Sequence, residues 1–182
     1  KIRFHFRDLL RVEKWNVGII PVAIEKLLQA GEFTIPEPVW LKLNSQKSVY
    51  HADPMGFVKE GNLQILCEEY DYKTEKGILT SFQVHSQTYQ VSSKTTALEK
   101  EYHLAFPYLF EFENIHYCLP ENSVSGNVDL YRYDELAGKL VFVQTLIADL
   151  HAVDTSLFYH EGFWWLLFTD NVATNERLNI WF

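Results

Sequence analysis

Three stretches of the chain decide the fold, because they align with one another without gaps: DPMGFVKEGNLQILCEE at 53–69, FPYLFEFENIHYCLPEN at 106–122 and DTSLFYHEGFWWLLFTD at 154–170. Their first residues lie 53 and 48 positions apart. In each stretch an aromatic residue comes four positions after the first residue, a turn-forming residue follows four positions later, and a polar pair ends the stretch. Such self-similarity at a fixed period is the sequence signature of a repeat architecture.

Each stretch predicts a β-hairpin, because a short apolar run, a turn residue and a second aromatic run follow one another. The turn residues are Gly61, Asn114 and Gly162. Runs of alternating apolar and polar residues predict third strands at 78–85, 128–135 and 178–182. Fourth strands are expected at 88–91 and 140–146.

Two further strands are predicted before the first stretch, at 15–20 and 39–43, as the third and fourth strands of a preceding repeat. A short helix is predicted between them near 21–30, with Pro21 in its first turn and Gly31 at its end.

Four strands in a repeat of about fifty residues are typical of a β-propeller blade. We therefore predict an all-β propeller, with residues 1–182 as a single, incomplete domain of about three four-stranded antiparallel blades and part of a preceding one. A β-sandwich has no reason to hold the repeated features in register. The repeated aromatic residues are expected to be buried between blades: Phe57, Phe110 and Phe158.

The composition favours a packed domain with a neutral ligand. Of 182 residues, 47% are hydrophobic and 15% aromatic, which is ample for a core. The net charge of −8 argues against nucleic acid as a partner, since no basic surface is available for phosphates. No apolar run is long enough to span a membrane. Cys67 and Cys118 lack metal-ligand spacing and are expected to be buried thiols, although a disulfide stays possible.

Acidic residues recur at the ends of the predicted hairpin strands. The first residue of one hairpin strand and the last residue of the next lie at the same end, so these side chains are expected near one mouth of the propeller. They are Asp53, Glu68, Glu69, Glu121, Asp154 and Asp170. Facing carboxylates suit glycoside hydrolysis, in which one acts as acid and another as base or nucleophile. Each carboxylate could instead cap a turn or accept backbone N–H groups.

Two histidines recur as well, since His103 and His151 each stand three residues before a repeat. They are expected either to bind substrate or to anchor adjacent blades by hydrogen bonds, and metal ligation is the less favoured interpretation. No metal and no cofactor is predicted. Pro54 is expected to hold Asp53 in an extended conformation and so to fix the direction of its carboxylate.

The motifs ADPMGFVKEGNLQILCEEYDYKTEKG, HLAFPYLFEFENIHYCLPEN and HAVDTSLFYHEGFWWLLFTD resemble those of a known family. It is the amino-terminal propeller domain of plant glucosamine inositolphosphorylceramide transferases, which is also found in bacterial proteins, some of them beside a formyltransferase-like domain. The resemblance runs from about Trp15 to Phe182. That domain is similar in turn to the five-bladed propellers of glycoside hydrolase family 43, which implies a five-bladed type here.

The resemblance to these hydrolases also implies residue roles. An Asp in an Asp-Pro motif opens their first blade and acts as general base, which matches Asp53. A second blade-opening Asp tunes pKa values, which Asp154 matches, and Glu121 or Glu68 would supply the acid. Phe106 departs from the pattern, because this blade-opening position is apolar here.

The sequence thus predicts a carbohydrate-active propeller, either glycosidase-like or a glycan-processing module that works with a transferase domain. Asp53, Glu121 and Asp154 are the expected catalytic residues. Substrate contacts are expected from Glu68, Glu69, His103, His151 and Asp170. The alternative is a propeller that binds a glycan or a protein without catalysis. The expected partner is a carbohydrate or glycoconjugate, the parent chain is expected to hold further domains, and the best expectation for location is cytoplasmic.

Overall fold

The computed structural model describes residues 14–28, 34–43, 46–170 and 178–181. It is an all-β structure built from antiparallel sheets, with one short helix in the described part of the chain. Each sheet contains strands that are consecutive in sequence and paired with their neighbours. The prediction of radially repeated blades, rather than two stacked sheets, is confirmed.

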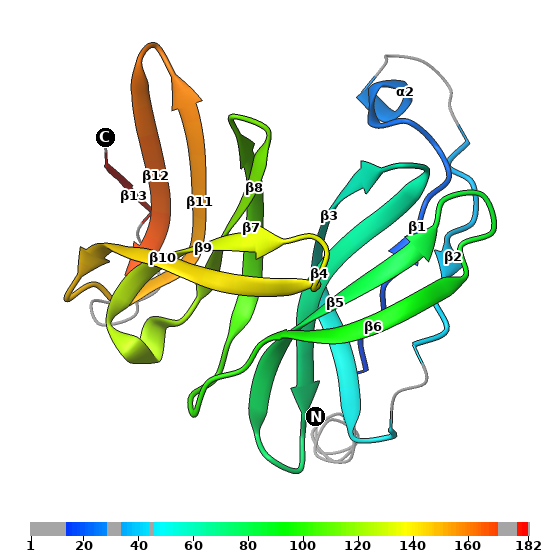
Figure 1. Cartoon of the computed structure of the whole chain (residues 1–182), viewed down its shortest axis with the longest axis horizontal. Coiled ribbons are helices and arrows are strands. Elements are labelled where there is room, and N and C mark those ends of the chain that lie inside the picture. The colour runs from blue at the N-terminus through cyan, green and yellow to red at the C-terminus, as the bar shows by residue number, and fades with distance from the viewer. Residues whose placement is uncertain (1–13, 29–33, 44–45, 171–177, 182) are drawn as a thin grey trace, which may run out of the picture.

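Two sheets are complete four-stranded blades (Figure 1). Blade 1 consists of β3 (Val49–Lys59), β4 (Asn62–Asp71), β5 (Lys76–His85) and β6 (Val91–Leu98), in that order. Blade 2 consists of β7 (Ala105–Phe112), β8 (Ile115–Glu121), β9 (Asn127–Asp134) and β10 (Lys139–Ala148). A 3₁₀ turn at Ser123–Ser125 joins β8 to β9. The fourth strand predicted at 88–91 was misplaced, because β6 begins only at Val91.

Blade 3 has three described strands, β11 (Ala152–His160), β12 (Phe163–Asp170) and β13 (Leu178–Trp181). At the other end of the molecule, β1 (Gly18–Ile19) pairs antiparallel with β2 (Val39–Trp40). Between them lies α2 (Ile24–Leu28), inside the predicted helical insert, whereas Gly31 lies outside the described residues.

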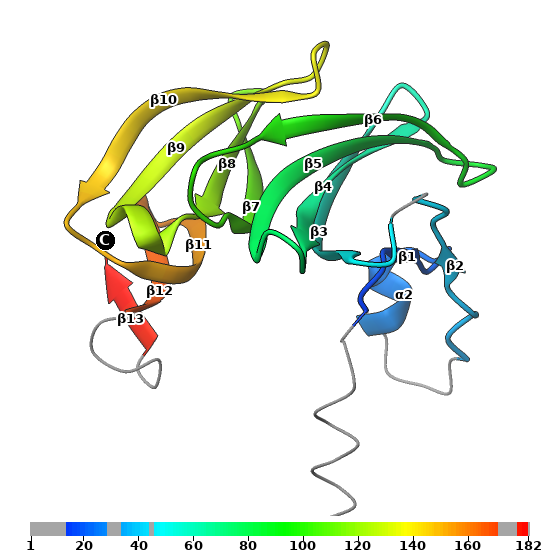
Figure 2. The same ribbon diagram turned by 90° about the horizontal axis from the view of Figure 1, so that it is seen from below.

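The first strands of the blades lie on the inner side of an arch, and β6 and β10 lie on its outer side (Figure 2). β7 packs against β3 and β4, and β11 packs against β7 and β8. Residues that recur in the first strand of each blade therefore lie on the inner side of the arch.

All three predicted hairpins end in two-residue turns. Lys59 pairs with Asn62, Phe112 with Ile115, and His160 with Phe163. Both central residues of each turn have positive φ, which is the type I′ geometry that matches the twist of the flanking strands. The turns are Glu60–Gly61 (48° and 75°), Glu113–Asn114 (51° and 61°) and Glu161–Gly162 (51° and 87°).

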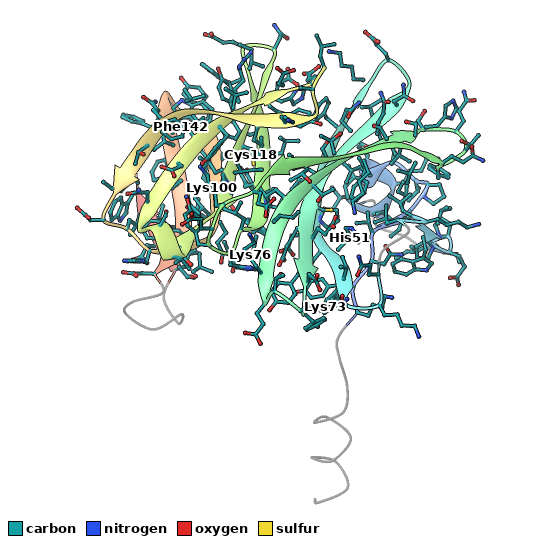
Figure 3. All side chains as sticks on the ribbon, turned by 60° about the horizontal axis from the view of Figure 1, so that its bottom comes forward. His51, Lys73, Lys76, Lys100, Cys118 and Phe142 are labelled. Carbon is teal, nitrogen blue, oxygen red and sulfur yellow. The ribbon has the colours of Figure 1, made fainter. Side chains whose placement is uncertain are left out.

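The apolar core consists of clusters between and beside the blades. One joins blade 1 to blade 2 and includes Leu79, Leu104 and Tyr131, and another joins blade 2 to blade 3 and includes Leu119 and Phe168. Val17 and Leu41 of the amino-terminal segment pack on blade 1 beside Phe82. The two cysteines are buried free thiols, as predicted, and burial raises the pKa of each. In Figure 3, Cys118 lies within the second blade, whereas Phe142 lies on its outermost strand.

The repeated aromatic residues pack between blades in two cases out of three. Phe57 stacks on His116 of blade 2 with ring centroids 3.5 Å apart. Phe110 meets Trp164 of blade 3 at 5.8 Å. The prediction that Phe158 is buried between blades was wrong, because 45% of its surface is exposed and its ring stacks on Trp165 of its own blade.

Candidate functional site

A β-bulge occurs at the same place in the first strand of every blade. In blade 1, Asp53 and Pro54 together oppose one residue of β4, because the pairing slips between Ala52 and Met55. The same slip occurs around Phe106 in blade 2 and around Asp154 in blade 3. A bulge bends its strand and changes the direction of a side chain. The repeat thus presents three equivalent side chains at the inner side of the arch.

The first residue of each bulge has a left-handed backbone. The φ angles are 49° at Asp53, 34° at Phe106 and 52° at Asp154. The prediction that Pro54 keeps Asp53 extended was therefore wrong, because the bulge overrides the preference of a residue before proline. Left-handed φ angles cost non-glycine residues free energy and cluster at functional sites.

The bulges bring carboxylates from three blades together. Glu68 stands opposite Ala52 and Glu121 opposite Ala105, so each lies next to a bulge. The peptide N–H of Asp154 donates a hydrogen bond to Glu121 Oε2 at 3.1 Å. The peptide N–H of Phe106 acts on the Asp53 carboxylate in a similar sense, because it lowers the pKa of that group. Both interactions run from one blade to the next.

Charge repulsion couples the carboxylates across the three blades. Burial and then the charges of Asp53 and Glu121 raise the pKa of Glu68 to about 7. Burial also raises the pKa of Glu121, with further repulsion from Asp154 and Asp53 and an opposing effect of the Asp154 N–H. The pKa of Asp53 is raised by partial desolvation and by Asp154, and lowered by the Phe106 N–H. One site thus holds carboxylates of different proton affinity, which is the arrangement that acid–base chemistry needs.

A cavity of about 330 Å³ opens beside Asp53 and Glu68, and its wall includes Tyr50. The ring of Tyr50 stacks on Tyr70 at 5.1 Å and meets Tyr72 edge-on at 5.5 Å. Burial and the charge of Glu68 raise the pKa of the Tyr50 phenol, so its hydroxyl stays protonated. Carboxylates beside aromatic rings form a surface that offers both hydrogen-bond acceptors and apolar faces.

Glu69 does not join this cluster, although it was predicted there. Its carboxylate contacts His51 at 3.2 Å, Thr80 at 3.0 Å and Lys94 at 2.6 Å. Although burial opposes it, these hydrogen bonds lower the pKa of Glu69 to about 2. Successive side chains of a strand point to opposite faces, so Glu69 turns into the blade while Glu68 faces the cavity. Its role is structural.

Asn122, at the same repeat position in blade 2, also makes a buried contact within its own blade. The side-chain amide of Asn122 donates to Asp129 Oδ2 at 3.0 Å, and Thr145 donates to Asp129 Oδ1 at 2.7 Å. In blade 3, Asp170 lies at the end of β12, opposite Ala152. Because Asp170 shares the position of Glu69 and Asn122, we leave it out of the site.

The two repeated histidines anchor neighbouring segments, as one of the two interpretations predicted. The peptide N–H of Gly77 donates to His103 Nδ1 at 2.8 Å. His151 Nδ1 lies 2.6 Å from the carbonyl oxygen of Ser123, so this nitrogen donates. His103 also lies beside the site, with Nε2 at 3.8 Å from Glu68 Oε1. Because burial lowers the pKa of His103, this contact is one of a neutral ring rather than an ion pair.

Sequence reasoning missed three parts of the site. Tyr50 was not singled out, Phe106 was noted only as a departure from the repeat, and the peptide N–H groups of the bulges leave no trace in residue types. Within the described ranges, no group of three or more His, Cys, Asp and Glu side chains is arranged to hold a metal ion. No helix in the described part of the chain is long and apolar enough to cross a membrane.

Comparison with known proteins gives the family. Residues 38–182 match the family described as glucosamine inositolphosphorylceramide transferase 1, N-terminal. The chain belongs to this family. Curated relatives with the name glucosamine inositolphosphorylceramide transferase 1 include one from Oryza sativa subsp. japonica, 28% identical over 139 residues, and one from Arabidopsis thaliana, 28% identical over 141 residues. Each match covers 74% of this chain and 18% of the relative, so this member of the family spans about a fifth of the relatives' length.

Among solved structures, an exo-1,5-α-L-arabinanase from a bovine ruminal metagenomic library is similar to this family member. The TM-score is 0.48 at 11% sequence identity, and the match covers 79% of this chain and 57% of the arabinanase.

Proposed function

We propose that the carboxylate cluster is a carbohydrate-active site of the glycosidase type, which handles a glycan for a longer, transferase-related protein. The observation that carries this proposal is the gathering of Asp53, Glu68, Glu121 and Asp154 from three blades, with the pKa of Glu68 raised to about 7. Cleavage of a glycosidic bond needs one carboxyl group that keeps its proton near neutral pH and another that is ionised.

The environments of the carboxylates support separate roles. Glu68 is buried and repelled by its neighbours, which favours the protonated form and makes it the proton donor to a leaving oxygen. Desolvation raises the pKa of Asp53 and the Phe106 N–H opposes that rise, but Asp53 is more exposed than Glu68, so it is the better candidate for the ionised base or nucleophile. Asp154 repels both Asp53 and Glu121 and so tunes their pKa values. Glu121 is the second candidate for the acid.

A carbohydrate fits this site better than an anionic ligand. The cluster lies in a chain with a net charge of −8 and would repel phosphate or sulfate groups. Carboxylates accept hydrogen bonds from sugar hydroxyls, and the tyrosine cluster at Tyr50 supplies an apolar surface beside them.

A second function is a propeller that binds a glycan without turnover. It is favoured by the peptide N–H bonds to Asp53 and Glu121, because carboxylates that only hold neighbouring blades together make the same bonds.

The test is to measure turnover and binding together on wild type and on Asp53→Asn. The substitution keeps the size of the side chain and removes its basicity, so turnover of a glycoside should fall by orders of magnitude while most of the affinity remains. Glu111→Gln, an exposed carboxylate towards the other end of β7, is the matched control and should behave as wild type. Unchanged turnover in Asp53→Asn would exclude this residue as the base. Binding by wild type without any turnover would favour the second function.

A further inference from the structure

Phe106 occupies the place of a site carboxylate. It is the first residue of the bulge in blade 2, as Asp53 is in blade 1 and Asp154 in blade 3, and the slip in pairing is the same in all three. Equivalent bulges give equivalent directions to the bond between Cα and Cβ. The Cα–Cβ bond of Phe106 therefore points towards the same end of the propeller as those of Asp53 in blade 1 and Asp154 in blade 3.

The backbone of Phe106 is unusual for its residue type. Its φ of 34° lies in the left-handed region, which Asp tolerates more readily than a bulky aromatic residue does. Glycine would take this conformation without strain. A large side chain held in such a conformation is a reason to look for a function of that side chain.

Phe106 also acts on a site carboxylate. Its N–H lowers the pKa of Asp53, and the charge of Asp154 raises the pKa of the same group. The ring is half-buried, so part of it faces solvent. Tyr108 of the same strand lies beside it, with ring centroids 6.5 Å apart, and the Tyr108 hydroxyl donates to the Leu157 carbonyl of blade 3.

We infer that Phe106 is the apolar platform on which a sugar ring lies while the surrounding carboxylates bind its hydroxyls. This inference rests on the proposed carbohydrate function and assigns a specificity-determining role to one residue. One face of a pyranose or furanose ring carries C–H groups, which pack on an aromatic face, and the hydroxyls at its edge reach the carboxylates. A small polyhydroxylated ligand without such a C–H face gains no affinity from the ring of Phe106.

The test uses binding of a panel of neutral methyl glycosides and disaccharides of hexoses and pentoses, measured by calorimetry on the full chain. Phe106→Gly removes the ring but suits the left-handed φ and keeps the N–H that holds Asp53, so the folded state and its bulge are retained. We expect Phe106→Gly to weaken binding by about two- to tenfold, which is the factor that one aromatic contact is worth. Phe106→Trp should retain binding, and glycerol, which lacks a ring face, should bind wild type and Phe106→Gly alike.

Phe112→Ala is the matched control, because this exposed aromatic residue lies at the other end of β7. It should bind the panel as wild type does. Equal affinity of wild type and Phe106→Gly for a bound sugar would overturn the platform and leave the carbohydrate function standing. Failure of wild type to bind any sugar of the panel would instead overturn the proposed function, and the platform with it.

Discussion

Glu68 and Glu69 are adjacent in the chain and have opposite electrostatic environments. The pKa of Glu68 is raised to about 7, chiefly by burial, and that of Glu69 is lowered to about 2 by hydrogen bonds from His51, Lys94 and Thr80. From the sequence both are acidic residues at a strand end. The strand alternation predicts that they point to opposite faces, but only the paired structure tells which of them faces the cavity.

The first prediction concerns the pH dependence of stability at Glu68. Its pKa is higher in the folded state than the ordinary value of 4.5, so the folded state binds the proton more tightly than the unfolded state does. The free energy of unfolding should therefore fall as pH rises from about 4.5 to 7, by about 2–3 kcal/mol from this residue. Glu68→Gln should remove most of that loss. Urea unfolding at several pH values measures it, and an equal slope in both proteins would contradict the assignment.

Glu69→Gln should behave in the opposite way. The pKa of Glu69 is lowered in the folded state, so its contribution to stability is present above about pH 4.5 and is lost as pH falls through about 2. At neutral pH we expect the variant to lose about 2–3 kcal/mol of unfolding free energy. The difference from wild type should shrink in acid. A loss that is the same at pH 7 and pH 3 would show that packing, rather than charge, is responsible.

The hairpins are the elements that sequence reasoning predicts best. Gly61, Asn114 and Gly162 stand at the same position of the three aligned stretches, and each is the second residue of a type I′ turn. The bulges could not be predicted, because Asp-Pro and Phe-Pro favour an extended first residue, and the left-handed φ depends on pairing with the next strand. The start of β6 was misplaced because the polar run before Val91 carries no clear alternation.

At the turn in blade 2, Asn114 has a φ of 61°, which Asn tolerates better than Ala does. Asn114→Ala should lower the free energy of unfolding by about 1 kcal/mol. Asn114→Gly should be neutral or slightly stabilising, since glycine takes this φ without strain. Thermal unfolding of the two variants checks the prediction. Similar losses in both would mean that the amide group, and not the backbone conformation, stabilises the turn.

In the whole molecule, stability depends on packing between blades. Phe110 lies between blades 2 and 3 against Trp164, so Phe110→Ala should cost about 2–3 kcal/mol, towards the low end for a half-buried aromatic residue. Phe158→Ala provides the control at the same repeat position, where the ring is exposed, and should cost about 1 kcal/mol or less. Denaturant unfolding separates the two. Equal costs would show that contacts within one blade, and not between blades, determine the effect.

The blade architecture was predictable from the spacing of the repeats. Six carboxylates were expected together, and four of them, Asp53, Glu68, Glu121 and Asp154, affect one another's electrostatics in the structure. Phe158 shows the limit of repeat symmetry, because its ring stacks on Trp165 of its own blade, whereas Phe57 and Phe110 contact aromatic rings of the next blade. The roles of Glu69 and Asn122 show another limit, since the residue type changes between blades while the buried polar contact is kept.

Two carboxylates of the candidate site interact with the backbone of the following blade: the Phe106 N–H acts on Asp53, and the Asp154 N–H donates to Glu121. In both cases the carboxylate belongs to one blade, and the N–H that lowers its pKa belongs to the next blade. The electrostatics of the candidate site therefore depends on how neighbouring blades are packed. A small rotation between two neighbouring blades would therefore change the proton affinity of these carboxylates without altering a single side chain.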